Sequence, residues 1–135
     1  MNTSSSISLF IGRLCMCAIF IITGVWKFVN FNGVSQEMEA KGFPMVAFFL
    51  VTAAIVEILG GLSFLFGYKT RLWAVILMLY LIPVTIIFHD FWNAAEAQKY
   101  MQIIEFLKNL TIIGGLWDII GAGPGRISLD SLTKK

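Results

Sequence analysis

Several ionisable side chains lie inside long apolar runs of this sequence, where a charge is costly. Glu57 is the single charged residue of the run over residues 43–67, and it lies close to the middle of that run. An ionisable group at the centre of a membrane-spanning helix costs a few kcal/mol unless it faces a bundle interior and finds a partner. Glu57 therefore requires a polar interior that the other helices must build.

Three of these residues form a predicted inner group. Arg13, Glu57 and Asp118 fall in the half of the bundle that is expected to face the cytoplasm, within about two helical turns of one another. One cation between two carboxylates makes a sensible buried network. We therefore expect Arg13 to pair with Glu57, with Asp118 or with both.

A second predicted group, Lys27, His89, Lys108 and Asn109, gathers in the outer half of the bundle. Lysine and histidine side chains without a deep carboxylate would make a cationic, donor-rich pocket that suits an anion or the carbonyl oxygens of a quinone. His89 is the candidate proton carrier because the unperturbed pKa of histidine lies near neutrality. The alternative is that both groups serve only as hydrogen bonds between helices, with Lys27 a terminal lysine that reaches the membrane surface.

Composition indicates one all-α integral membrane domain over residues 1–135. Of the 135 residues 58% are hydrophobic and only 13% are charged, about half the charged share of a soluble domain. The net charge of +2 does not favour nucleic acid as a partner. Cys15 and Cys17 lie on different sides of one helix and are interpreted as apolar helix residues. No metal site is expected.

Four transmembrane helices are predicted, at about residues 7–29, 43–67, 72–88 and 103–121.

The distribution of positive charge predicts the orientation of this four-helix bundle. Polar loops are expected at 31–42, which could hold a short amphipathic turn, and at 93–102. The side that holds both termini carries Lys69, Arg71, Arg126, Lys134 and Lys135, whereas the loops on the opposite side carry Lys41 and Lys99. Because positive residues concentrate on the cytoplasmic side, both termini are predicted to be cytoplasmic.

Short motifs in a fixed order make the chain resemble the DoxX family of membrane proteins over nearly its whole length. They are Gly12-Arg13, Gly24-x-x-Lys27, Lys41-Gly42-x-Pro44, Glu57 with Gly60-Gly61, Gly67-x-x-x-Arg71, Phe88-His89 with Phe91-Trp92, Lys108-Asn109, Gly114-Gly115, Gly123-Pro124-Gly125-Arg126 and Ser128-x-Asp130. The resemblance implies a four-helix bundle in a bacterial inner membrane. Asp118 is not part of the family pattern, so its expected role rests on spacing alone.

The resemblance also implies functions, and three remain open. The first is a quinone-linked accessory of oxidative or sulfur metabolism, acting on thiosulfate or thiols as a subunit of a quinone-dependent oxidoreductase. It would have no cofactor of its own, and would borrow a quinone or a partner's cofactor. The second is a non-enzymatic scaffold in the lipid bilayer that assembles protein partners or copies of itself. The third, a transporter of small solutes or protons, is weakened by the lack of internal repeats.

Overall fold

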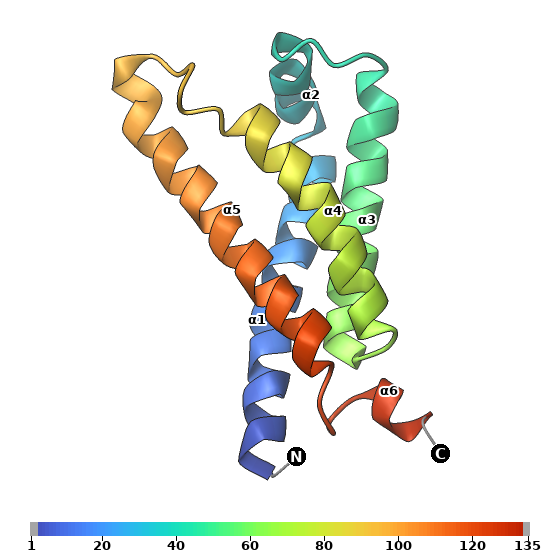
Figure 1. Cartoon of the computed structure of the whole chain (residues 1–135). Helices are drawn as coiled ribbons and strands as arrows, with labels where there is room; N and C mark the ends of the chain where they lie inside the picture. Colours follow the sequence, from blue (N-terminus) through green and yellow to red (C-terminus); the bar gives the residue numbers. More distant parts are fainter. Residues whose placement is uncertain (1–2, 134–135) are drawn as a thin grey trace.

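Helices make up all of the regular secondary structure in the computed structural model, which describes residues 3–133. Four of them are long and two are short. In chain order they are α1 (Thr3–Val29), α2 (Phe31–Ala40), α3 (Val46–Phe66), α4 (Thr70–Phe88), α5 (Glu96–Ala122) and α6 (Leu129–Leu132). Figure 1 shows that the beginning of α1 and the segment that carries α6 lie at the same end of the molecule.

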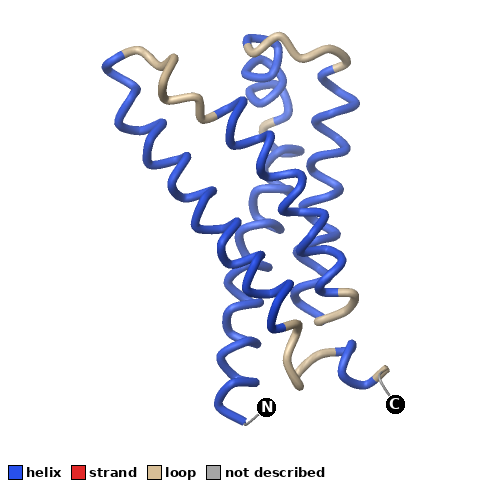
Figure 2. The backbone as a smooth tube through the Cα atoms, in the orientation of Figure 1, coloured by secondary structure: helices blue, strands red, loops and turns tan. Residues whose placement is uncertain are grey.

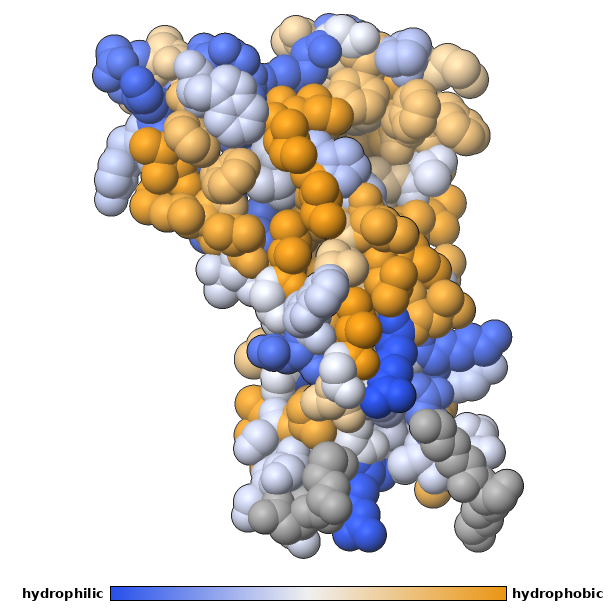
Figure 3. All heavy atoms as spheres, viewed as in Figure 1, coloured by the Kyte–Doolittle hydropathy of each residue, from blue (hydrophilic) through white to orange (hydrophobic). Residues whose placement is uncertain are grey.

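Three of the long helices, α1, α3 and α4, are long and apolar enough to cross a membrane. Figure 2 shows that the turns between helices lie toward the two ends of the molecule, so that helices fill its middle. The face in Figure 3 carries hydrophobic side chains across its middle and hydrophilic ones at its ends. This distribution suits a bilayer, and the helices satisfy their own backbone hydrogen bonds in hydrocarbon.

The fourth long helix, α5, does not meet the same standard of length and apolarity, because it carries Glu105, Lys108 and Asp118 along its length. Membrane crossing by α5 and the side of the membrane on which the termini lie both stay predictions. Lys134 and Lys135, which contribute to the predicted orientation, lie outside the described residues.

Two segments that were expected to be loops are largely helical. Residues 31–40 form α2, a full helix that buries Met38. Its apolar residues Phe31, Val34 and Met38 recur at helical spacing, and this periodicity outweighs the asparagine and glycine between them. Likewise α5 begins at Glu96, inside the expected loop over 93–102.

Helices α1 and α3 pack closely because glycine lies at their contact. A Cβ atom added to Gly24 of α1 would stand 3.0 Å from the carbonyl oxygen of Ala54 on α3. One added to Gly61 of α3 would stand 3.2 Å from the carbonyl oxygen of Cys17 on α1. Small residues at such a crossing let two backbones approach, as is common in membrane proteins. This close contact holds α1 and α3 in the register that aligns their polar side chains.

Helix α5 is attached chiefly through its C-terminal half. Its buried residues are Leu116 and Ile119, and the guanidinium of Arg71 on α4 donates to the carbonyl oxygen of Gly121 at 3.1 Å. Toward its N-terminal end α5 diverges from the other long helices (Figure 1).

Candidate functional site

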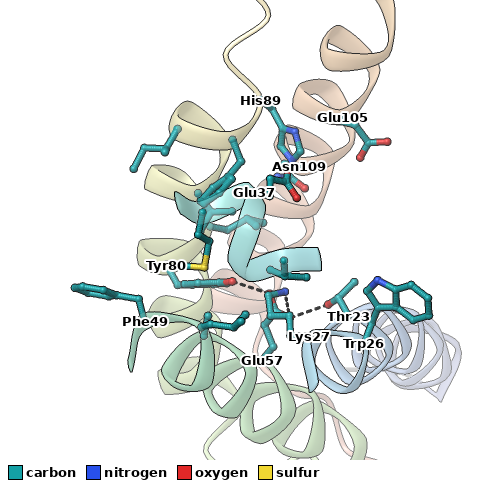
Figure 4. A pocket seen from close by; sticks show the side chains of 18 of the residues that line it. Thr23, Trp26, Lys27, Glu37, Phe49, Glu57, Tyr80, His89, Glu105 and Asn109 are labelled. Atoms are coloured by element: carbon teal, nitrogen blue, oxygen red, sulfur yellow. Dashed lines mark hydrogen bonds and ion pairs between the residues drawn. The ribbon is translucent and has the colours of Figure 1, made fainter. Parts of the chain in front are cut away.

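Glu57 lies near the middle of α3, and four side-chain contacts hold its carboxylate. The Lys27 ammonium lies 2.9 Å from Oε1 and 2.8 Å from Oε2. The Thr23 hydroxyl donates to Oε2 at 2.9 Å, and the Tyr80 hydroxyl donates to Oε1 at 2.7 Å. Only 6% of the Glu57 side chain is exposed. Figure 4 shows the three donors converging on this carboxylate from α1 and α4.

These contacts correct the prediction that Glu57 pairs with Arg13. Side chains on a helix lean toward its N-terminus, so both cations of α1 lean toward the end of the molecule where α1 begins. The Lys27 ammonium therefore lies at the level of Thr23 and Glu57. The Arg13 guanidinium, by contrast, is directed away from Glu57.

Arg13 instead binds backbone at the end of the bundle where the chain begins. Its side chain is buried, and it donates to the carbonyl oxygen of Phe64 at 3.2 Å and to that of Ile127. Its guanidinium carbon also lies 5.6 Å from the centre of the Phe10 ring. The carbonyl of Phe64 belongs to the last turn of α3, where the helix dipole favours a cation.

Asp118 does not join a buried network either. Its side chain is exposed on α5 and makes no hydrogen bond or ion pair within residues 3–133. The predicted trio of Arg13, Glu57 and Asp118 is therefore separated. Glu57 belongs to the neighbouring group that was expected to lack a deep carboxylate.

The predicted outer residues Lys27, His89, Lys108 and Asn109 all line one cavity of about 780 Å³, which we call the main pocket. Glu57 and Tyr80 line it too, as do Glu37 and Glu105. Its walls are largely apolar and come from α1 to α5, including Phe20, Trp26, Met38, Phe43, Phe49, Leu50, Leu81, Pro83, Ile87, Phe88 and Ile112.

The main pocket is not the cationic site that the sequence predicted, because its lysines are paired. Lys27 is paired with Glu57, and Lys108 lies 2.6 Å from the carboxylate of Glu105 one turn earlier on α5. His89 Nδ1 shares a hydrogen bond of 3.2 Å with the amide oxygen of Gln102. The pocket therefore offers polar groups in charge-balanced pairs rather than an excess of positive charge.

Two of the residues that bind Glu57, Tyr80 and Thr23, were missed in the sequence. Tyr80 lies in an apolar run and resembles ordinary core, although a tyrosine hydroxyl in the middle of a span usually needs a partner. Thr23 lies one turn before Lys27 on the same face of α1. This spacing could have predicted that Thr23 faces the same polar interior as Lys27.

A further ion pair joins the turn after α2 to the turn after α4. The Lys41 ammonium lies 2.5 Å from the Asp90 carboxylate, which also accepts from the Asn93 amide at 3.3 Å. These hydrogen bonds lower the pKa of Asp90 below its usual value. The Phe43 ring stacks on Phe88, with centroids 5.5 Å apart, beside this pair. The turn after α2 is thereby tied to the turn after α4.

A smaller cavity of about 410 Å³, which we call the second hollow, follows the contact between α1 and α5. Its lining comes from α1 with Ser8, Leu9, Gly12, Arg13, Cys15 and Met16, and from α5 with Thr111, Ile112, Gly115, Asp118 and Ile119.

Comparison with known proteins places this architecture in a family. The family model described as DoxX matches residues 8–90. The inner membrane protein YqjF of Escherichia coli is 34% identical over all of this chain and 98% of its own length. The inner membrane protein YphA of the same organism is 33% identical over 90% of this chain and 87% of its own length.

More distant relatives are eukaryotic. The Surfeit locus protein 4 homolog of Schizosaccharomyces pombe is 25% identical over 92% of this chain, which corresponds to 49% of that protein. No solved structure matches the chain. Three helices able to span a bilayer and two full-length inner membrane relatives indicate a multi-pass protein of the bacterial inner membrane, and the chain belongs to the DoxX family.

Proposed function

We propose that this protein binds a quinone in the main pocket and acts as a quinone-linked accessory of oxidative or sulfur metabolism. The observation that carries the proposal is the buried Glu57 cluster of Lys27, Thr23 and Tyr80 at one wall of a large apolar cavity. Small-molecule sites are typically concave cavities of about 300–1,000 Å³ with a few placed polar groups. The main pocket fits this description.

The charge balance of the pocket favours a quinone over an anion. Lys27 and Lys108 each have a carboxylate partner, and Glu37 adds a further acidic side chain to the lining. A bound anion would have to compete with Glu57 and Glu105 for these ammonium groups. A neutral ring with carbonyl oxygens can accept a hydrogen bond from a remaining N–H of an ammonium group without displacing its carboxylate.

The polar residues have separate roles in this proposal. Lys27 supplies a donor for a carbonyl oxygen of the ring, while the hydroxyls of Tyr80 and Thr23 donate to Glu57 and hold it at the pocket wall. Reduction of a quinone takes up protons with the electrons, and we assign the carrying of these protons to Glu57 and His89. Electrons would come from a thiol or sulfur donor, either directly or through a partner protein. We also propose that α5 crosses the membrane as a fourth span, with both termini cytoplasmic.

The proposal is tested by titrating the purified protein with a quinone that bears a short alkyl tail, following the fluorescence of Trp26 and the other tryptophans. Wild-type protein should bind saturably. Tyr80→Phe removes the hydroxyl that holds Glu57 Oε1 at the pocket wall without changing the packing volume, so quinone affinity should fall about three- to tenfold, comparable to the loss of one hydrogen bond.

The matched control is Tyr100→Phe, because Tyr100 is 74% exposed and does not line the pocket. This variant should bind quinone like the wild type. Absence of saturable binding, or equal affinities for the two variants, would overturn the proposal and favour the scaffold function.

A further inference from the structure

We propose that the groove between α1 and α5 holds the apolar tail of the bound quinone, so that the ligand is a long-tailed membrane quinone rather than a small water-soluble one. The inference rests on the proposed quinone site and extends it. The groove consists of the part of the main pocket between α1 and α5, together with the second hollow.

The two cavities adjoin each other along the contact between α1 and α5. Ile112 of α5 lines both of them. On α1 the lining residues continue from Trp26 and Thr23 in the main pocket to Met16 and Gly12 in the second hollow. From Thr23 to Gly12 the helix rises about 16 Å. In this proposal, an extended chain attached to a ring beside Glu57 runs past Ile112 from the main pocket into the second hollow.

The groove opens laterally. On its α1 side Trp26 is 57% exposed and Ile19 is 39% exposed. A Cβ atom added to Gly12 would meet nothing within 4 Å, and one added to Gly115 would meet only the Met16 side chain, at 3.4 Å. Because α1 is a candidate membrane span, this opening faces acyl chains. A membrane-dissolved ligand could enter from the side.

Apart from Asp118, whose carboxylate has no partner among the described residues, the polar residues of the second hollow offer little to a polar ligand. The Ser8 hydroxyl donates to the Ser4 carbonyl, and the Thr111 hydroxyl donates to that of Leu107. Arg13 directs its hydrogen bonds to Phe64 and Ile127 instead. Hydrocarbon from Leu9, Met16 and Ile112 therefore dominates the wall, and Asp118 lies toward the far end. An apolar chain is the occupant that suits this lining.

The test compares a dimethoxy-methyl-benzoquinone with and without a decyl tail, in the same detergent micelles. Gly12→Leu and Gly115→Leu fill the second hollow. The matched control is Gly114→Leu, which lies on the same helix with open space around it but lines neither cavity. Thermal unfolding of each variant checks that it is folded, and size-exclusion chromatography with light scattering measures its oligomeric state.

The tailed quinone should bind wild type at least about tenfold more tightly than the tail-less one, since each buried methylene adds to affinity. Filling the second hollow should remove most of this difference and leave tail-less binding unchanged, whereas Gly114→Leu should preserve it.

Unchanged tailed binding in Gly12→Leu and Gly115→Leu would overturn the groove assignment while the quinone site stands. Absence of binding by either quinone would overturn both proposals. A change of oligomeric state in these two variants, with tailed binding intact, would assign the groove to a second copy of the chain instead.

Discussion

The Glu57 carboxylate is stable in the middle of the bundle because three side chains from two other helices meet it. Lys27 supplies the compensating charge, and 19% of its side chain is exposed. Removing one member of a buried ion pair leaves an uncompensated charge, which is usually far more harmful than removing both members. The contribution of this pair to the stability of the protein can therefore be measured as a coupling free energy between Lys27 and Glu57.

Lys27→Met should lower the free energy of unfolding by about 3 kcal/mol, because Glu57 then remains buried without its cation. The double variant Lys27→Met with Glu57→Met should recover most of this loss. Thermal or denaturant unfolding in detergent measures both. Equal losses in the single and double variants would show that Lys27 and Glu57 are not coupled.

Asp90 gives the molecule a pH dependence outside the membrane-spanning segments. Hydrogen bonds from Lys41 and Asn93 lower its pKa in the folded state below the ordinary value of 3.8. A carboxylate with a lowered pKa contributes stability above its unfolded pKa, and that contribution is lost as the pH falls through the folded pKa.

Asp90→Asn should therefore be less stable than wild type near neutral pH, and the difference should shrink below about pH 4. High salt should also reduce it, since the pair is partly exposed. Melting temperatures across the pH range measure this. A difference that stays constant from neutral to acid pH would mean that the Lys41 pairing contributes nothing.

At the scale of elements, the contact between α1 and α3 aligns Thr23 and Lys27 with Glu57. Gly24 and Gly61 permit this contact, and a side chain at either position meets backbone atoms of the other helix. Backbone cannot move aside as the end of a flexible side chain can. The pair of helices should therefore tolerate little added volume at this crossing.

Gly61→Ala should destabilise the protein by about 1–3 kcal/mol, since overpacking forces the two helices apart. Gly114→Ala should be neutral or slightly stabilising, because alanine favours a helix and nothing lies near its Cβ. Unfolding of the two variants under identical conditions gives the comparison. Equal stability of both would contradict the close packing of α1 on α3.

At the scale of the whole molecule, the segment after α5 ties together the end of the bundle where the chain begins. The Asp130 carboxylate accepts from the backbone amides of Lys69 and Thr70 at 2.8 and 3.0 Å, at the start of α4. The Asp130 amide donates to the carbonyl oxygen of Gly67. Arg13 reaches the same segment at Ile127.

Asp130→Ala should cost about 1 kcal/mol of stability, comparable to the loss of a helix N-cap, and should speed proteolysis of the C-terminal segment. Asp118→Ala serves as the control, because this exposed carboxylate makes no hydrogen bond or ion pair within the described residues. Limited proteolysis and thermal unfolding report the two effects. Identical behaviour of both variants would contradict the tie.

Much of this arrangement could be predicted from residue type and helical spacing. The apolar runs indicate the long helices, and helix faces suffice to bring Lys27, His89, Lys108 and Asn109 to one cavity. The predicted pairing of Glu57 with Arg13 was wrong because long side chains lean toward the helix N-terminus, which brings Lys27 to Glu57 and carries Arg13 away from it. The Asp130 contacts could not be predicted, since they join residues far apart in the chain through an irregular segment.

Photolabelling tests the central claim most directly, that a quinone head binds beside the Glu57 cluster. A quinone that carries a photoreactive group on its ring is irradiated with the protein in membranes, and the labelled peptides are mapped. We predict label in the segments around Thr23 and Tyr80, and its loss with excess unlabelled quinone. Label confined to outward residues such as Phe48 and Ile55, which are 59% and 46% exposed, or label that excess quinone does not remove, would contradict the account.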